Sequence, residues 1–174
     1  MAADPLTEFN ELPATAARDA LLACCAAPSW AERMLTGRPY CSARDAVRQS
    51  EAIVVSLTDA DLGQALAGHP RIGERPAADQ AGGPTAAQWS RQEQSRVSTA
   101  DAQTARELAA ANREYEQRFG HIYLVCASGR TAAQLLALLR ARLANDDERE
   151  WAVVRSELQK ITEIRLLRLL AGAP

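Results

Sequence analysis

The chain contains two histidines, and one of them lies in a segment suited to hold a catalytic side chain. His69 lies between Gly68 and Gly73 and is followed by Pro70. Proline favours an extended conformation for the residue before it, and glycines permit tight backbone turns. A near-neutral imidazole held in this way is suited to act as a general base. The alternative is an ordinary surface-loop histidine, and we expect His121, in an apolar stretch, to be a packing residue.

A second polar group follows further along the chain. Ser90, Glu93 and Gln94 are spaced i, i+3 and i+4, so a helix would place a hydroxyl, a carboxylate and an amide on one face. Together they offer hydrogen-bond donors and acceptors within a small area. The alternative interpretation is a solvated polar face.

An arginine near the C-terminus lies within an apolar helical stripe. At helical spacing Arg165 falls at the centre of a stripe that contains Trp151, Val154, Leu158, Ile161 and Leu169. A guanidinium on the core-facing side must meet a carboxylate, because an unpaired buried charge costs several kcal/mol (about 3–5). That carboxylate can come from the protein or from a ligand, and the sequence favours neither.

The composition is that of an ordinary globular protein. Of 174 residues, 47% are hydrophobic and 24% charged, which is enough for one domain, residues 1–174, with its own core. The net charge of −2 provides no basic field to attract nucleic acid or an anionic membrane, so we expect neither partner. No apolar run is long enough to cross a membrane and no secretion-signal pattern occurs at the start, so we expect a cytoplasmic protein.

The common signatures of metal and phosphate sites do not occur. The four cysteines include an adjacent pair and no CxxC, so we expect free buried thiols: Cys24, Cys25, Cys41 and Cys126. Neither histidine has a second one at i+3 or i+4, and no glycine-rich phosphate loop or GxSxG elbow occurs. Any chemistry must therefore run without these motifs, and we expect no metal.

Helix-forming residues dominate after the first dozen positions, which predicts an all-α fold of seven or eight helices. Four glycines and three prolines in residues 68–85 predict one long ordered loop. Residues 121–126 are strand-like but lack a partner strand, so we expect a buried extended connection. The predicted helices cover residues 14–26, 29–34, 42–57, 58–67, 85–97, 98–119, 131–144 and 148–170.

Taken together, these motifs resemble one family, the 2-oxo-4-hydroxy-4-carboxy-5-ureidoimidazoline (OHCU) decarboxylases of urate degradation. The resemblance covers roughly residues 6–170, and each motif alone is weak, whereas their order and separation are specific. The motifs are His69-Pro70, then Ser90-x-x-Glu93-Gln94-Ser95, then Tyr115-x-x-x-Phe119-Gly120, and finally the helix with Arg165-Leu166.

The resemblance implies a homodimeric, all-α, cofactor-free carboxy-lyase that converts OHCU to (S)-allantoin and CO2 in purine catabolism. It implies His69 and Glu93 as the catalytic pair. The implied substrate contacts are Pro70, Ser90, Gln94 and Arg165, with backbone groups of Ile122, Tyr123, Leu124, Val125 and Cys126. The chain departs from the family pattern at His121, where phenylalanine is usual, and at Arg71, to which no role is assigned.

The implied substrate explains why no cofactor would be needed. Its departing carboxylate lies beside a C=N bond, which can accept the electron pair that CO2 leaves behind. Two other functions are compatible with the same residues: a non-catalytic helical module that binds a purine-like ligand, and a purely structural helical protein. Turnover would separate the enzyme from both.

Overall fold

The computed structural model describes residues 4–74, 81–97 and 99–171, and these residues contain nine helices and no strand. The predicted all-α class is confirmed, and each predicted helix has a counterpart. The helices are α1 (Pro5–Glu11), α2 (Ala14–Cys24), α3 (Pro28–Thr36), α4 (Ala43–Val55), α5 (Asp59–Leu66), α6 (Gly83–Glu93), α7 (Ala102–Phe119), α8 (Ala132–Arg142) and α9 (Asp147–Leu170).

Helix α1 is the element that the sequence analysis did not predict. Asp4 caps it by accepting a hydrogen bond from the Thr7 amide at 3.2 Å, and Pro5 occupies the first turn, where its missing N–H costs nothing. Phe9 is the buried residue of this helix. Its cap and proline are the usual start signals of a helix, but only seven residues carry the pattern.

Capping residues explain most of the other helix boundaries. The Thr58 and Thr131 hydroxyls begin α5 and α8 in reciprocal capping boxes, and Asp101 begins α7. Gly120 ends α7 with φ of 73°, a left-handed conformation that favours glycine. Ser98, part of the predicted start of this helix, lies outside the described residues.

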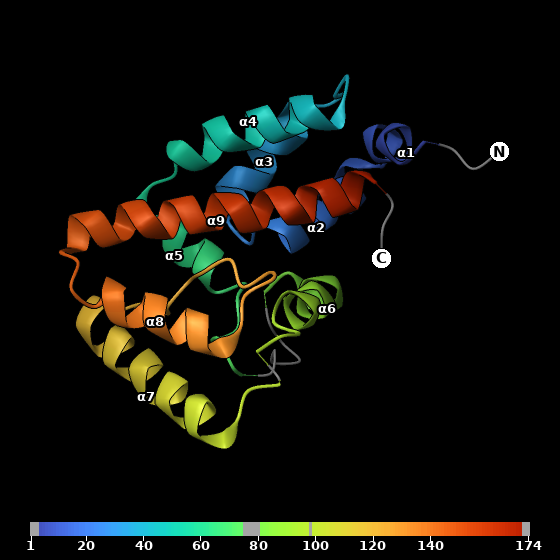
Figure 1. Ribbon diagram of the computed structural model, residues 1–174. Helices are drawn as coiled ribbons and strands as arrows, with labels where there is room; N and C mark the ends of the chain where they lie inside the picture. Colours follow the sequence, from blue (N-terminus) through green and yellow to red (C-terminus); the bar gives the residue numbers. More distant parts are fainter. Residues whose placement is uncertain (1–3, 75–80, 98, 172–174) are drawn as a thin grey trace.

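Helix α9 crosses the whole molecule and organises the packing. Figure 1 shows α3 and α4 on one side of it and α7 and α8 on the other. Helices α1, α2 and α4 contact α9 directly, and α7 packs against α8. Two hydrophobic clusters result: one is built largely on α1–α5 and α9, and the other on α7, α8 and residues 123–127.

The loop after α5 is described up to residue 74 and again from residue 81, so the middle of the predicted 68–85 loop lies outside the described residues. Helix α6 begins at Gly83, slightly earlier than predicted. Gly82 has φ of 90°, and a Cβ there would lie 2.8 Å from the Ala86 Cβ and 3.1 Å from the Leu22 carbonyl oxygen. This turn therefore requires glycine.

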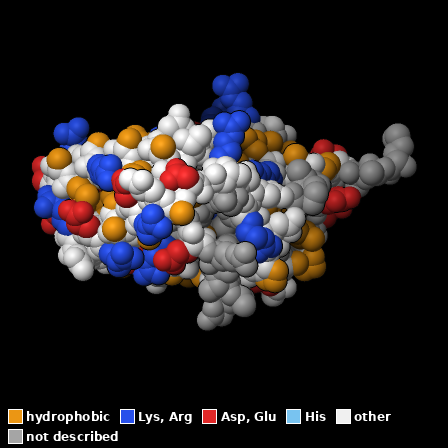
Figure 2. All heavy atoms as spheres, turned by 60° about the horizontal axis from the view of Figure 1, so that its bottom comes forward, with side chains coloured by type: hydrophobic (Ala, Val, Ile, Leu, Met, Phe, Trp, Pro, Cys, Tyr) orange, Lys and Arg blue, Asp and Glu red, His pale blue; other side chains and the backbone are white. Residues whose placement is uncertain are grey.

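The described surface carries both charge signs. Figure 2 shows basic and acidic side chains interspersed over the face on which α7 and α8 lie, so that face presents no field of one sign. Within the described ranges, no helix is both long enough and apolar enough to cross a membrane.

Candidate active site

A small cavity brings most of the predicted site residues together. It measures about 20 Å³, which is room for roughly one water molecule. It lies at the boundary of the two hydrophobic clusters, since Ile161 packs with the first and Tyr123 and Val125 with the second. Its lining consists of His69, Pro70, Ile72, Ser90, Glu93, Gln94, Tyr123, Leu124, Val125, Ala127 and Ile161.

His69 brings an unpaired ring nitrogen to this cavity. Its Nε2 is buried and has no hydrogen-bond partner among the described residues. Burial of the ring, and secondarily the positive charge of Arg165, hold the pKa of His69 well below its usual value. The imidazole is therefore neutral near pH 7, and a neutral imidazole nitrogen can accept a proton.

The backbone that carries His69 is fastened to two helices. The Asn112 Nδ2 of α7 donates to the Ile72 carbonyl oxygen at 2.9 Å, and the Gly73 amide donates to the Gln94 Oε1 at 2.9 Å. Arg71, to which the sequence assigned no role, pairs with Glu116 of α7, with 2.9 Å between Nη2 and Oε2. The His69 turn is thus held from α7 and from the end of α6.

Glu93 and Arg165 form a two-bonded ion pair beside the cavity. The Arg165 Nε lies 2.9 Å from Glu93 Oε1, and Nη2 lies 2.8 Å from Oε2. The same Nη2 donates to the Ser90 hydroxyl at 3.0 Å. The side chains are only 2% and 9% exposed, so the charges compensate each other away from water. The carboxylate that buried Arg165 requires is therefore supplied by the protein.

Gln94 differs from its two neighbours in what it contacts. It lies at the C-cap of α6, and its side-chain oxygen accepts from the Gly73 amide instead of joining Ser90 and Glu93 on Arg165. It still lines the cavity. The three residues therefore share the site, but Gln94 connects α6 to the His69 turn.

The predicted extended wall is partly present at the cavity. Tyr123, Leu124 and Val125 line it, whereas Ile122 and Cys126 do not, and Arg165 lies behind Glu93 and Ser90. The sequence analysis missed three apolar lining residues: Ile72, Ala127 and Ile161. Ile161 had a signal, since it precedes Arg165 by one helical turn on the stripe already identified.

A larger groove of about 820 Å³ lies elsewhere, among α2, the start of α6 and the end of α9. Its polar lining side chains are Asp19, Thr85 and Gln88, with no histidine or arginine among the described residues that form it. In the described ranges, no group of three histidine, cysteine or acidic side chains could hold a metal ion. The small cavity is therefore the better candidate for chemistry.

Comparisons with known proteins agree with the sequence motifs. The family model for OHCU decarboxylase matches residues 10–167. The chain is 32% identical over 152 residues to the uric acid degradation bifunctional protein TTL of Arabidopsis thaliana, covering 85% of this chain but only 45% of that protein. It is 27% identical to the 2-oxo-4-hydroxy-4-carboxy-5-ureidoimidazoline decarboxylase of Amia calva, over 80% of this chain and 78% of the relative.

A solved structure has the same arrangement of helices. The crystal structure of an OHCU decarboxylase in the presence of (S)-allantoin superimposes with a TM-score of 0.72 at 30% identity, and the match covers 84% of this chain and 94% of that one.

Proposed function

Because this chain belongs to the OHCU decarboxylase family, we propose that it decarboxylates 2-oxo-4-hydroxy-4-carboxy-5-ureidoimidazoline to (S)-allantoin and CO2 in urate degradation. One observation supports this most directly: two side chains line the same cavity, a neutral histidine whose buried Nε2 has no partner among the described residues, and a carboxylate paired with Arg165. This is the pair that proton transfer without a metal requires.

In the proposed reaction, the bond to the carboxylate breaks and CO2 leaves. Its electron pair forms a C=C bond to the carbon that bears the ureido group, and the C=N electron pair moves to the ring nitrogen, which takes up a proton from water. The ring hydroxyl then loses its proton and becomes a carbonyl, while the carbon that bears the ureido group gains a proton. His69 takes the hydroxyl proton as general base. The substrate provides its own electron sink, so the proposal needs no cofactor.

Glu93 and Gln94 are proposed to bind the ureido N–H groups. Each carboxylate oxygen has two acceptor sites, so Glu93 can bind Arg165 and still accept from a ligand. Either Glu93 or protonated His69 then delivers the final proton to one face of the carbon that bears the ureido group. Pro70 and Ser90, together with backbone groups of the segment 122–126, complete the proposed contacts.

The ion pair limits what Arg165 can do. A guanidinium has five N–H donors, and three of those in Arg165 already bind Glu93 and Ser90. We propose that Arg165 holds Glu93 and Ser90 in place and uses its remaining donors for a substrate carboxylate or ring carbonyl. Because the cavity holds about one water, the substrate must displace lining side chains on binding.

The test replaces each histidine separately. In His69→Asn, the acceleration of CO2 release should fall by about 10²- to 10⁴-fold, the usual contribution of a general base. His121→Phe is the matched control, because the new ring keeps the packing against Trp151, whose ring centroid lies 4.4 Å away. Freshly generated substrate and time-resolved circular dichroism report allantoin chirality together with rate. Unchanged turnover to the S product in His69→Asn would overturn the assignment.

The assembly and location are also proposals. The family resemblance supports a homodimer, which light scattering after size-exclusion chromatography would test by mass. Four free cysteines support a reducing compartment such as the cytoplasm, which fractionation of the producing cells would test. We also propose that residues 1–174 form one domain, and a single cooperative unfolding transition would support that.

A further inference from the structure

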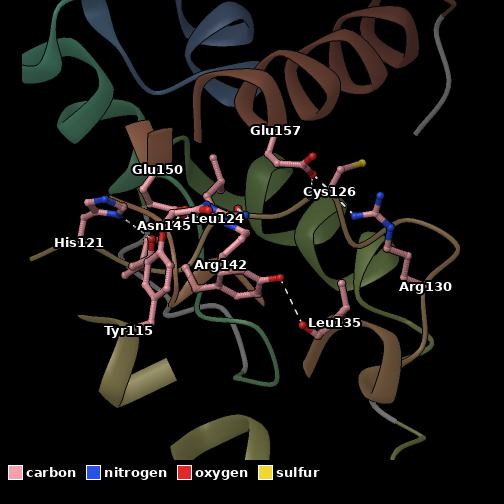
Figure 3. Close-up of polar contacts among 12 residues, drawn as sticks. Tyr115, His121, Leu124, Cys126, Arg130, Leu135, Arg142, Asn145, Glu150 and Glu157 are labelled. Carbon is pink, nitrogen blue, oxygen red and sulfur yellow. Dashed lines mark hydrogen bonds and ion pairs between the residues drawn. The ribbon is translucent and has the colours of Figure 1, made fainter. Parts of the chain in front are cut away.

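The segment 122–126, of which residues 123–125 line the cavity, has no strand beside it in the described part of the chain. Residues 123–125 are nearly fully buried, so their backbone groups need partners from the protein. Two charged side chains from different helices each provide one partner, one for Leu124 and one for the adjoining Cys126. The Arg142 Nη1 of α8 donates to the Leu124 carbonyl oxygen at 2.6 Å, and the Cys126 amide donates to the Glu157 Oε2 of α9 at 2.8 Å. Figure 3 shows both side chains reaching the segment.

Arg142 is itself held in a buried network. Its Nε lies 2.8 Å from Oε1 of Glu150, a residue with no exposure, and the Tyr115 hydroxyl also donates to that oxygen. Asn145 Nδ2 donates to the other oxygen, Oε2, at 2.7 Å. Burial alone would raise the pKa of Glu150, but the hydrogen bonds from Arg142, Tyr115 and Asn145 outweigh it and lower that pKa. The pair is therefore ionised, and Arg142 has little freedom to turn away from Leu124.

Glu157 holds the segment at Cys126, with a charge opposite to that of Arg142. Its side chain is 9% exposed, and Lys160 of the next helical turn pairs with its Oε1. Arg130 Nη1 lies 3.7 Å from the Oε2 that accepts the Cys126 amide. Two cations thus surround the carboxylate, which fixes its orientation toward the backbone.

We propose that Arg142 and Glu157 are positioning residues that hold the segment 122–126 at a fixed depth, so that the substrate presents one face to the proton donor. The inference rests on the proposed function. Buried ion pairs are often replaceable by apolar residues without loss of stability, so their presence on this wall is better explained by geometry than by stability. A displacement of about 1 Å at a reacting centre can cost about 10²-fold in rate.

Arg142 and Glu157 both contact backbone atoms of the segment and therefore set its position directly. The lining side chains on this wall are Tyr123, Leu124, Val125 and Ala127. His69 and Glu93 come from other elements of the cavity, the turn after α5 and helix α6. If the segment 122–126 shifts, the planar ring of the substrate can tilt, and a proton can then reach either face of that ring. Loss of Arg142 or of Glu157 should therefore affect the chirality of the product as well as the rate.

The experiment compares three variants of α9. Glu157→Gln keeps an oxygen that accepts the Cys126 amide, whereas Glu157→Leu removes the acceptor. Glu163→Leu is the matched control, because Glu163 lies on the same helix and forms none of the hydrogen bonds or ion pairs found among the described residues. For each variant, kcat, KM and the optical purity of allantoin are measured, with urea unfolding as the readout of stability.

We expect kcat/KM to fall about tenfold or more in Glu157→Leu, with allantoin of lower optical purity, and to stay within about twofold of the parent in the other two variants. The inference is overturned if Glu157→Leu changes only stability, or if Glu157→Gln is equally impaired. Arg142 is tested by combining Arg142→Met with Glu150→Leu, which avoids leaving an unpaired buried carboxylate. This double variant should also show lower kcat/KM and allantoin of lower optical purity.

Binding of (S)-allantoin, measured by calorimetry, separates this inference from the function on which it rests. If the parent protein binds allantoin but turns over no substrate, the proposed reaction fails, and the inference is still decided by weaker binding in Glu157→Leu than in Glu157→Gln. If the parent neither binds nor turns over, both fail.

Discussion

Glu93 and Arg165 are 72 positions apart in the chain and meet in an ion pair with two parallel hydrogen bonds. Removing one member of such a buried pair leaves the other charge without compensation. Arg165→Met should therefore lower the free energy of unfolding by about 3–5 kcal/mol, measured by urea denaturation at pH 7.

A double-variant cycle shows whether the pairing itself causes this loss. Glu93→Leu combined with Arg165→Met should be more stable than the sum of the two single losses predicts, because no unpaired charge remains. Arg168→Met is the control, since its side chain is 26% exposed and its Nη1, 3.6 Å from Glu93 Oε1, makes no hydrogen bond to any described residue. This substitution should cost less than about 1 kcal/mol. Additive losses in the double variant would contradict a direct coupling.

Asn112 connects α7 to the turn that carries His69, so its loss should affect both stability and activity. In Asn112→Ala the buried Ile72 carbonyl loses its donor, which should cost about 1–3 kcal/mol in urea unfolding. We also expect lower kcat/KM per folded molecule, because Ile72 is three residues from His69 and lines the same cavity.

Asn10→Ala is the matched control for this prediction. The Asn10 side chain also bonds to backbone groups. Its Nδ2 donates to the Tyr40 carbonyl oxygen and its Oδ1 accepts from the Tyr40 amide, each at 2.9 Å, and neither residue lines the cavity. Comparable destabilisation with unchanged kcat/KM is expected. Equal activity losses in both variants would show that instability alone explains the effect of Asn112→Ala.

Arg71 and Glu116 should tolerate an exchange of their charges. The pair is partly exposed, with side chains 45% and 24% accessible, so it contributes about 1 kcal/mol or less to stability. Arg71→Glu places like charges opposite each other and should raise KM through movement of the His69 turn. Adding Glu116→Arg should restore KM toward the parent value, and failure of this rescue would show that Arg71 acts through other contacts, such as Glu74 at 3.6 Å.

The sequence predicted more of the cavity lining than of the contacts that hold the cavity together. The periodic apolar stripe of α9 and the capping residues were sufficient for every described helix except α1, because those signals are local. Glu150 and Glu157 were missed, although both are buried and lie one helical turn before Val154 and Ile161 of the stripe. In the sequence, a buried carboxylate cannot be told from a solvent-exposed one until its partner is known. The partner of Glu150 is Arg142, which lies on another helix.

The pH dependence of stability should carry the signature of His69. The pKa of its imidazole is well below the ordinary value in the folded protein and about 6.5 in the unfolded chain. Below pH 6.5 the unfolded state therefore binds a proton that the folded state does not bind, so the free energy of unfolding falls as the pH falls, by up to about 1.4 kcal/mol per pH unit. Well above pH 6.5, where the imidazole is neutral in both states, this residue contributes no slope.

Urea denaturation between pH 7.5 and about 5, above the range where most carboxylates titrate, isolates this effect. His69→Asn should flatten the curve in this window, because asparagine has no proton to bind there. His121→Phe should retain the slope of the parent, since it leaves His69 unchanged. Parallel curves for the parent and His69→Asn would mean that the imidazole takes up a proton as readily in the folded protein as in water, and His69 would then be partly charged at the pH where the proposed reaction needs it neutral.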